Sequence, residues 1–98
     1  MNRDIFTIKI MGHVYKEELS EKLVLERNSC GTCCPNTLVI KICSSIPTSR
    51  KEETRIHEIF EALRFHLEID LPHDKLSALS EAWYLVLKEN PQLFKYGA

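Results

Sequence analysis

The spacing of hydrophobic residues changes once along the chain, near residue 49. Before this point apolar and polar residues alternate, in FTIKI at 6–10 and in TLVIKICSSI at 37–46. A two-residue period is typical of half-buried β-strands. With a further short run, KLVLER at 22–27, residues 5–47 are predicted to form about three strands. These runs are close together and are broken by MGH, EELSE and CGTCCPN, which favours antiparallel pairing of the hairpin type.

Beyond residue 49, apolar residues recur every three or four positions, and this pattern predicts two amphipathic helices. The first is expected over about 50–69, with Ser49 as its N-cap and Glu52 completing a capping box. It should end before Pro72, because proline disfavours helical backbone in the residue that precedes it. The second is expected over about 73–90. The two apolar stripes comprise Ile56, Ile59, Phe60, Leu63 and Leu67 in the first helix and Leu76, Leu79, Trp83, Val86 and Leu87 in the second.

Strands followed by helices indicate an α+β fold, here a small antiparallel sheet packed on two C-terminal helices. A length of 98 residues, of which 44% are hydrophobic and 28% charged, fits a single domain over residues 1–98 with one small core. We expect the two apolar stripes to pack on each other and on the inner face of the sheet. The tail QLFKYGA is expected to dock through Leu93 and Phe94.

Charge and hydropathy exclude several kinds of partner. A net charge of −1 and a pI near 6.4 give no electrostatic reason to expect nucleic acid or an acidic membrane surface. The start of the chain lacks a basic segment leading into a long apolar run, so no signal peptide is predicted. No apolar window approaches the roughly 18 residues of a membrane span. The cytoplasm is therefore the expected compartment.

Four cysteines leave three interpretations open. Cys30, Cys33 and Cys34 lie in NSCGTCCPN, and Cys43 follows in the next apolar run. CGTC has the C-x-x-C form that binds zinc or performs redox chemistry. A zinc ribbon needs a second pair, which Cys34 and Cys43 do not supply, and a redox motif should open a helix rather than precede a strand. Reduced cysteines in a loop are favoured, while a small metal clip and a redox pair remain alternatives.

A cluster of candidate metal ligands lies on the polar edge of the two helices. His57 and Glu61 are about 40° apart on the first helix, and two side chains at i and i+4 can hold one zinc ion. His73 at the head of the second helix can supply a third ligand and leave the fourth position to water. Glu58, directly after the first ligand, is then the candidate general base that takes a proton from this water.

The string His57-Glu58-Ile59-Phe60-Glu61 differs from H-E-x-x-H in its last position. Two histidines and one carboxylate form a catalytic zinc composition, whereas Glu81 in place of His73 would give a harder site closer to what manganese or iron accepts. Glu81 and Tyr84 are candidates for a second shell of contacts around the ligands. The plain alternative is an ordinary polar helix edge, in which Glu58 favours the helix dipole and Glu61 pairs with Arg64.

The segment KEETRIHEIFEALRFHLEIDLPHDKLSALSEAWYLVLKENPQLF resembles a family of short zincin-like, minimal metallopeptidase-like proteins, frequent in bacteriophages and prophages of Gram-positive bacteria. The H-E-x-x-E string, its spacing to the second helix and the KENPQLF end carry the resemblance, which covers roughly residues 34–94. It implies a zincin-like fold and zinc-dependent hydrolysis of a peptide or protein substrate, with His57, Glu61 and His73 as ligands and Glu58 as base. The alternative is a non-catalytic interaction or structural protein of the same fold, whose metal, if any, only joins the helices.

Overall fold

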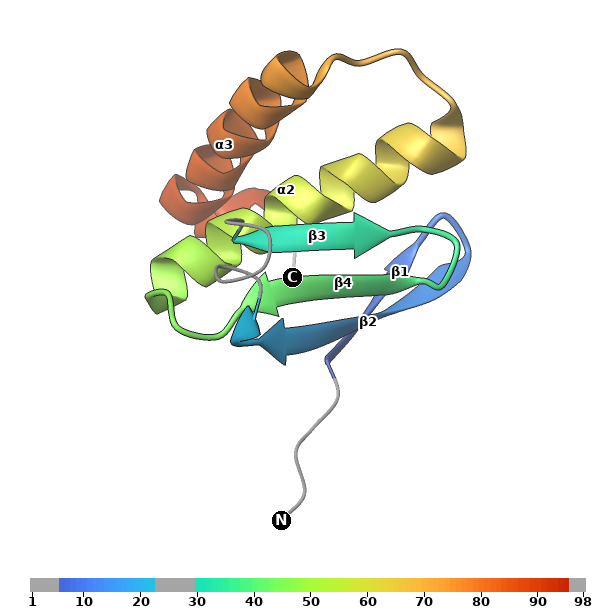
Figure 1. Cartoon of the computed structure of the whole chain (residues 1–98). Coiled ribbons are helices and arrows are strands. Elements are labelled where there is room, and N and C mark those ends of the chain that lie inside the picture. The colour runs from blue at the N-terminus through green and yellow to red at the C-terminus, as the bar shows by residue number, and fades with distance from the viewer. Residues whose placement is uncertain (1–5, 23–29, 96–98) are drawn as a thin grey trace.

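The computed structural model of the chain describes residues 6–22 and 30–95, which form a four-stranded sheet and two long helices (Figure 1). This arrangement confirms the predicted α+β class. The second helix is followed by a short 3-10 helix. In chain order the elements are β1 (Phe6–Ile10), β2 (His13–Ser20), β3 (Gly31–Cys34), β4 (Val39–Cys43), α2 (Thr48–Leu67), α3 (His73–Glu89) and η1 (Pro91–Phe94).

The sheet is mixed, with strand order β1-β2-β4-β3. β1 pairs with β2 and β3 with β4 in antiparallel fashion, but the central pair β2–β4 is parallel, so the prediction of a purely antiparallel sheet is wrong. The strand β3 occupies part of CGTCCPN, which was expected to be only a break. Apart from Lys22, the predicted KLVLER run lies outside the described residues. The β1–β2 turn has positive φ at Met11 (51°) and Gly12 (85°), as the tight hairpin turns require.

The predicted alternation in the strands is confirmed by their burial. Ile10, Tyr15, Ile40 and Ile42 point to the covered face of the sheet and form the core with Ala62 of α2. The register places Cys33 opposite Ile40 and Gly31 opposite Ile42, so both face the helices as well. The other face carries the exposed side chains of Lys9, Lys16 and Lys41, together with the exposed Val14.

Helix α2 begins at Thr48, directly after Pro47, and no side chain caps it. The predicted capping box is therefore wrong, because Ser49 already lies inside the first turn. The helix ends at Leu67, within two residues of the prediction. Glu68 follows in the left-handed conformation (φ 53°) and donates its backbone N–H to the carbonyls of Arg64 and Phe65, which terminates the helix.

The buried face of α2 is not the predicted apolar stripe. Thr54, Glu58 and Ala62 are its buried residues, whereas the stripe is only partly covered and Leu67 is 48% exposed. The reason is a close approach between the helix and β3. A Cβ added to Gly31 would lie 2.5 Å from the Thr54 side chain, so at this point the helix approaches a strand that has no side chain in the way.

Helix α3 packs on α2 rather than on the sheet (Figure 1). It begins at His73 as predicted, and it buries Leu76 and Ser80. Trp83, which was expected in the core, is 40% exposed, and Phe94 in the tail that was expected to dock is 77% exposed. The expectation that both apolar stripes are covered is therefore wrong for α3. In the described part of the chain, no helix is long and apolar enough to cross a bilayer.

Candidate metal centre

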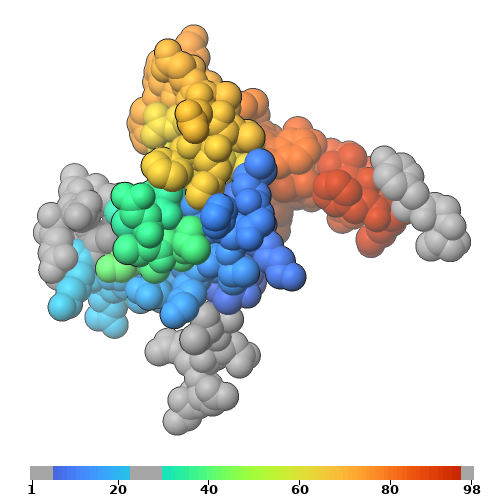
Figure 2. Space-filling model, turned by 90° about the vertical axis from the view of Figure 1, so that its right-hand side faces the viewer, coloured from blue at the N-terminus to red at the C-terminus, as the bar shows by residue number. Residues whose placement is uncertain are grey.

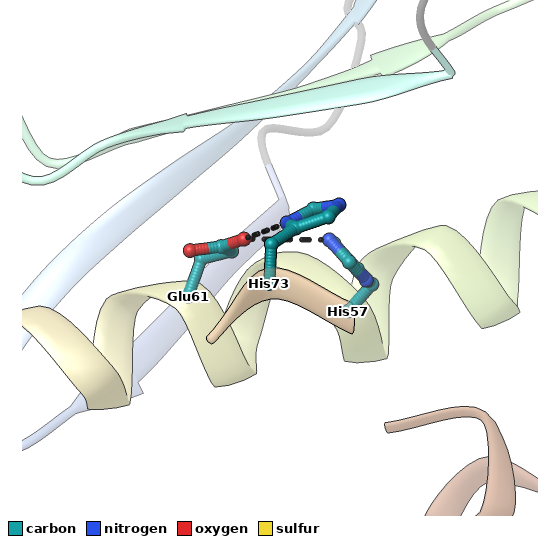
Figure 3. A group of neighbouring side chains, drawn as sticks. All are labelled: His57, Glu61 and His73. Carbon is teal, nitrogen blue, oxygen red and sulfur yellow. Dashed lines mark hydrogen bonds and ion pairs between the residues drawn. The ribbon is translucent and has the colours of Figure 1, made fainter. Parts of the chain in front are cut away.

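The three predicted ligands meet at one point (Figure 3). His57 and Glu61 lie one turn apart on α2, and His73 is the first residue of α3. One oxygen of Glu61, Oε2, lies 3.5 Å from Nε2 of His57 and 3.2 Å from Nδ1 of His73. Ligand atoms about 2.0–2.1 Å from a tetrahedral zinc ion are roughly 3.3 Å from one another, so these two separations match a shared ion. One ligand atom from each of the three residues lies within 4.8 Å of the others.

Arg64 holds the carboxylate of Glu61 in this position. Its Nη2 donates to the second oxygen of Glu61, Oε1, at 2.5 Å, and its Nη1 donates to the carbonyl of Leu71 at 3.2 Å. The first contact leaves Oε2 directed at the two histidines. The second ties the connection between the helices to α2, which places His73 over the cluster. From the sequence, Arg64 was expected only as a partner that competes for Glu61. In the structure, its contact with Oε1 leaves Oε2 available, so Glu61 can pair with Arg64 and still act as a metal ligand.

His57 is oriented by a residue that the sequence did not single out. The buried Ser80 of α3 donates its hydroxyl hydrogen to the carbonyl of Ser77 at 3.1 Å, and its Oγ lies 3.5 Å from Nδ1 of His57. A proton on Nδ1 leaves Nε2 free as the ligand atom. Burial lowers the pKa of His57, which favours the neutral imidazole that a metal needs. Ser80 directly precedes Glu81 in the sequence, but no spacing pattern in the second helix pointed to this serine.

Glu58 is buried beside the cluster, with 5% of its surface exposed. Burial, and then the charge of Glu61, raise its pKa from 4.5 to about 8. Its carboxylate lies against Gly31 of β3, because a Cβ at that position would be 3.1 Å from Glu58 Oε2. Gly31 thus leaves room for a carboxyl group between the helix and the sheet edge. The sequence contains this glycine within CGTC, but its partner on α2 is visible only in the fold.

A cleft of about 720 Å³ opens beside the cluster. Its walls are the edge strand β3, the middle of α2 and the first half of α3, and Figure 1 shows β3 running alongside α2. His57, Glu58, Glu61 and His73 all line it. The side chain of His73 is 71% exposed, whereas those of His57 and Glu61 are 23% and 16% exposed. Two of the three candidate ligands, His57 and Glu61, are therefore mostly covered, whereas His73 is on the side that solvent reaches.

The cysteines do not form a metal cluster of their own. Among the described residues, the groups of three or more potential ligands include no cysteine, and all four thiols are free. Cys33 and Cys34 lie in β3 rather than in the expected loop. Cys30 and Cys33 line the cleft. Burial, and then the charges of Glu58 and Glu61, raise the pKa of Cys33 to about 12, so this thiol stays protonated at neutral pH.

Glu81 and Tyr84, which were expected to contact the metal ligands, differ in position. Glu81 is exposed and lines the cleft, and its role in orienting a histidine stays a prediction. Tyr84 is not among the cleft-lining residues, and its hydroxyl donates to Glu52 at 2.9 Å. The remaining histidines lie elsewhere: His66 contacts the Tyr15 hydroxyl at 2.6 Å and stacks on His13 with ring centroids 4.6 Å apart.

Comparison with known proteins finds no matching family model, no similar curated protein and no similar solved structure. The interpretation of the site therefore rests on its geometry and chemistry.

Proposed function

We propose that the protein binds one divalent metal ion, with zinc as the first candidate, and hydrolyses a peptide bond with water activated at that ion. His57, Glu61 and His73 are the proposed ligands, and Glu58 is the proposed general base. The observation that carries the proposal is the position of Glu61 Oε2, which lies 3.5 Å and 3.2 Å from imidazole nitrogens on two different helices, at an open cleft. Two neutral imidazoles and a carboxylate are a ligand set of catalytic zinc sites.

In the proposed hydrolysis, the metal ion and Glu58 have different roles. A bound zinc ion supplies the Lewis acid that lowers the pKa of water. Glu58 would accept one proton as the water oxygen attacks the carbonyl carbon, and would then give this proton to the amide nitrogen as the C–N bond breaks, leaving a carboxylic acid, which keeps the second water proton, and an amine. The buried carboxyl group favours its protonated form when no cation is near, but a neighbouring cation favours the ionised form that the base requires.

The edge strand suggests how an extended substrate could be held. In the described sheet β3 is the last strand and pairs with β4, and residues 30–33 line the cleft. An extended peptide that lies in this cleft beside β3 would cross the open side of the proposed ligand cluster. We expect recognition of the peptide backbone to dominate over selection of particular side chains.

A second candidate function is supported by the contacts of Glu61 itself. Its two oxygens already connect His57 and Arg64 of α2 with His73 of α3. Such a cluster, with or without a metal ion, can join the two helices in a non-catalytic interaction protein. In that function, Glu58 is a buried structural acid and its carboxylate has no role in turnover.

Metal titration and a cleavage assay on matched variants test the proposal. Wild type, His57→Ala, Glu58→Gln and the control His13→Ala are purified without chelator and titrated with zinc. We expect His57→Ala to lose zinc binding, with the other three retaining it, because His13 lies outside the cluster. Equal zinc binding by His57→Ala and His13→Ala would refute the metal site.

The cleavage assay then separates the two functions. Each zinc-loaded protein is incubated with a mixture of unstructured peptides, and new termini are identified by mass spectrometry. Loss of cleavage in Glu58→Gln, with zinc affinity unchanged, supports the hydrolase. Zinc binding without cleavage by wild type would refute the hydrolase and leave the non-catalytic function.

A further inference from the structure

Helix α3 has an apolar side that the rest of the described chain does not cover. Leu79, Trp83 and Val86 recur at i, i+4 and i+7, and they are 53%, 40% and 39% exposed. α2 covers only the neighbouring side of the helix, at Leu76 and Ser80. Figure 2 shows the later part of α3 and η1 projecting beyond the sheet. We call the uncovered surface of Leu79, Ala82, Trp83 and Val86 the α3 stripe.

Three large apolar side chains on this one side of α3 are each more than a third exposed. Contiguous exposed apolar surface is uncommon on monomers and marks interaction sites.

The ends of the stripe carry opposite charges. Lys75 precedes it and Glu89 follows it, and the series Lys75, Leu79, Ala82, Val86, Glu89 has the spacing 4, 3, 4, 3. This is the a/d spacing by which one helix packs along another. Ala82, the smallest side chain of the series, lies at its centre. The series is therefore complementary to itself when it is reversed: each lysine end meets a glutamate end, and the two small residues meet in the middle.

We propose that the α3 stripe is the contact surface of a homodimer, in which α3 of one copy packs antiparallel on α3 of a second copy. A two-fold axis near Ala82 would bring Lys75 of each copy beside the partner's Glu89, and the small alanines would let the helices approach closely. The contact is isologous, so it closes as a dimer rather than continuing as a filament.

The expected interface is small. α3 has 17 residues and is roughly 25 Å long, so two such faces with their flanking side chains bury roughly 1,000 Å² in total. This is the lower limit for a specific interface, and a dissociation constant of roughly micromolar order is expected. In the dimer α3 would be held on two sides rather than one. The proposal does not depend on the metal site, although both involve α3.

Concentration-dependent mass measurement tests the proposal. Sedimentation velocity of the full chain from about 1 to about 200 μM should show a shift from 11.4 kDa to twice that mass. Trp83 is the single tryptophan, so its emission should shift to shorter wavelength over the same range. Val86→Glu should abolish both changes, whereas the control Val14→Glu, on the exposed side of the sheet at a position 51% exposed, should leave them intact.

A charge exchange gives a second test that does not alter the apolar stripe. Lys75→Glu and Glu89→Lys should each weaken the dimer by roughly threefold to thirtyfold, since each creates two like-charged contacts. The double variant should recover wild-type affinity. Circular dichroism establishes that each variant is folded. A wild type that stays at 11.4 kDa at the highest concentration, or a dimer that Val86→Glu leaves unchanged, would overturn the proposal.

Discussion

Gly31 is the position where a single added methyl group should disturb both the fold and the site. In Gly31→Ala, the new Cβ would lie 2.5 Å from Thr54 Cγ2, 3.1 Å from Glu58 Oε2 and 3.1 Å from the carbonyl of Lys41. The first separation is shorter than real Cβ contacts allow, so α2 must move away from β3 or Thr54 must change its rotamer. Movement of α2, or the tight 3.1 Å contact of the new Cβ with Oε2, would displace Glu58, the proposed base.

The loss in free energy of unfolding caused by Gly31→Ala can be estimated from these contacts. Overpacking typically destabilises by about 1–3 kcal/mol, and the lower chain entropy of alanine in the unfolded state returns about 0.4–1 kcal/mol. The net loss is then about 1–2 kcal/mol, which corresponds to a fall in Tm of roughly 5–15 °C for a domain of this size. Urea unfolding followed by circular dichroism measures the free energy, and a thermal scan measures Tm.

A double-mutant cycle identifies the contact responsible. Thr54→Ser removes Cγ2, the nearest atom, so Gly31→Ala should cost less in this background, with a coupling energy of at least about 0.5 kcal/mol. Gly31→Ala with wild-type stability, or a cycle with no coupling, would show that α2 does not pack on β3 as closely as described.

Three further predictions concern the electrostatics of the site. Burial raises the pKa of Glu58 from 4.5 to about 8 in the folded protein. Between these two pH values, the folded state of chelator-treated protein keeps a proton that the unfolded state releases. The free energy of unfolding should therefore fall by up to about 5 kcal/mol from about pH 4.5 to about pH 8. Urea unfolding at both pH values should show a much smaller fall for Glu58→Gln, and an equal fall in both proteins would contradict the buried-acid assignment. Arg64→Ala should weaken zinc binding about tenfold to a hundredfold, because it frees the second oxygen of Glu61; unchanged affinity in a chelator competition would argue against this positioning role. Iodoacetamide should modify Cys34 before Cys33. Cys34 is exposed and hydrogen bonds from Thr37 lower its pKa, whereas burial raises the pKa of Cys33 to about 12. Peptide mass spectrometry measures the order of modification, and the reverse order would contradict the burial of Cys33.

The dimer and the metal site, if both are present, share one structural element. α3 carries His73 and the orienting Ser80 on the side facing α2, and the α3 stripe on another side. A second copy that holds α3 in place would reduce its motion relative to α2 and thus keep His73 near Glu61. Zinc affinity measured below and above the dimerisation range would detect this coupling, because binding to a more ordered ligand set has a lower entropic cost.

What could be predicted from the sequence is local in origin. The change of period near residue 49, the start of α3 at His73 and the alternating burial in β1 and β4 follow from repeats within short segments. The pairing of His57 with Glu61 on one face of α2 belongs to the same class, since 3.6 residues per turn place i and i+4 together whatever the rest of the chain does.

The features that the sequence did not predict depend on contacts between residues far apart in the chain. The edge strand β3 exists because β4 offers it hydrogen-bonding partners, although CGTCCPN alone has the composition of a turn. The side of α2 that is buried is the side that approaches Gly31, and not the side with the most hydrophobic residues. The same close approach buries Glu58. The meeting of His73 with Glu61 required the α2–α3 connection to fold back and be tied by Arg64. Such contacts arise from packing between elements, and no periodicity within either partner encodes them.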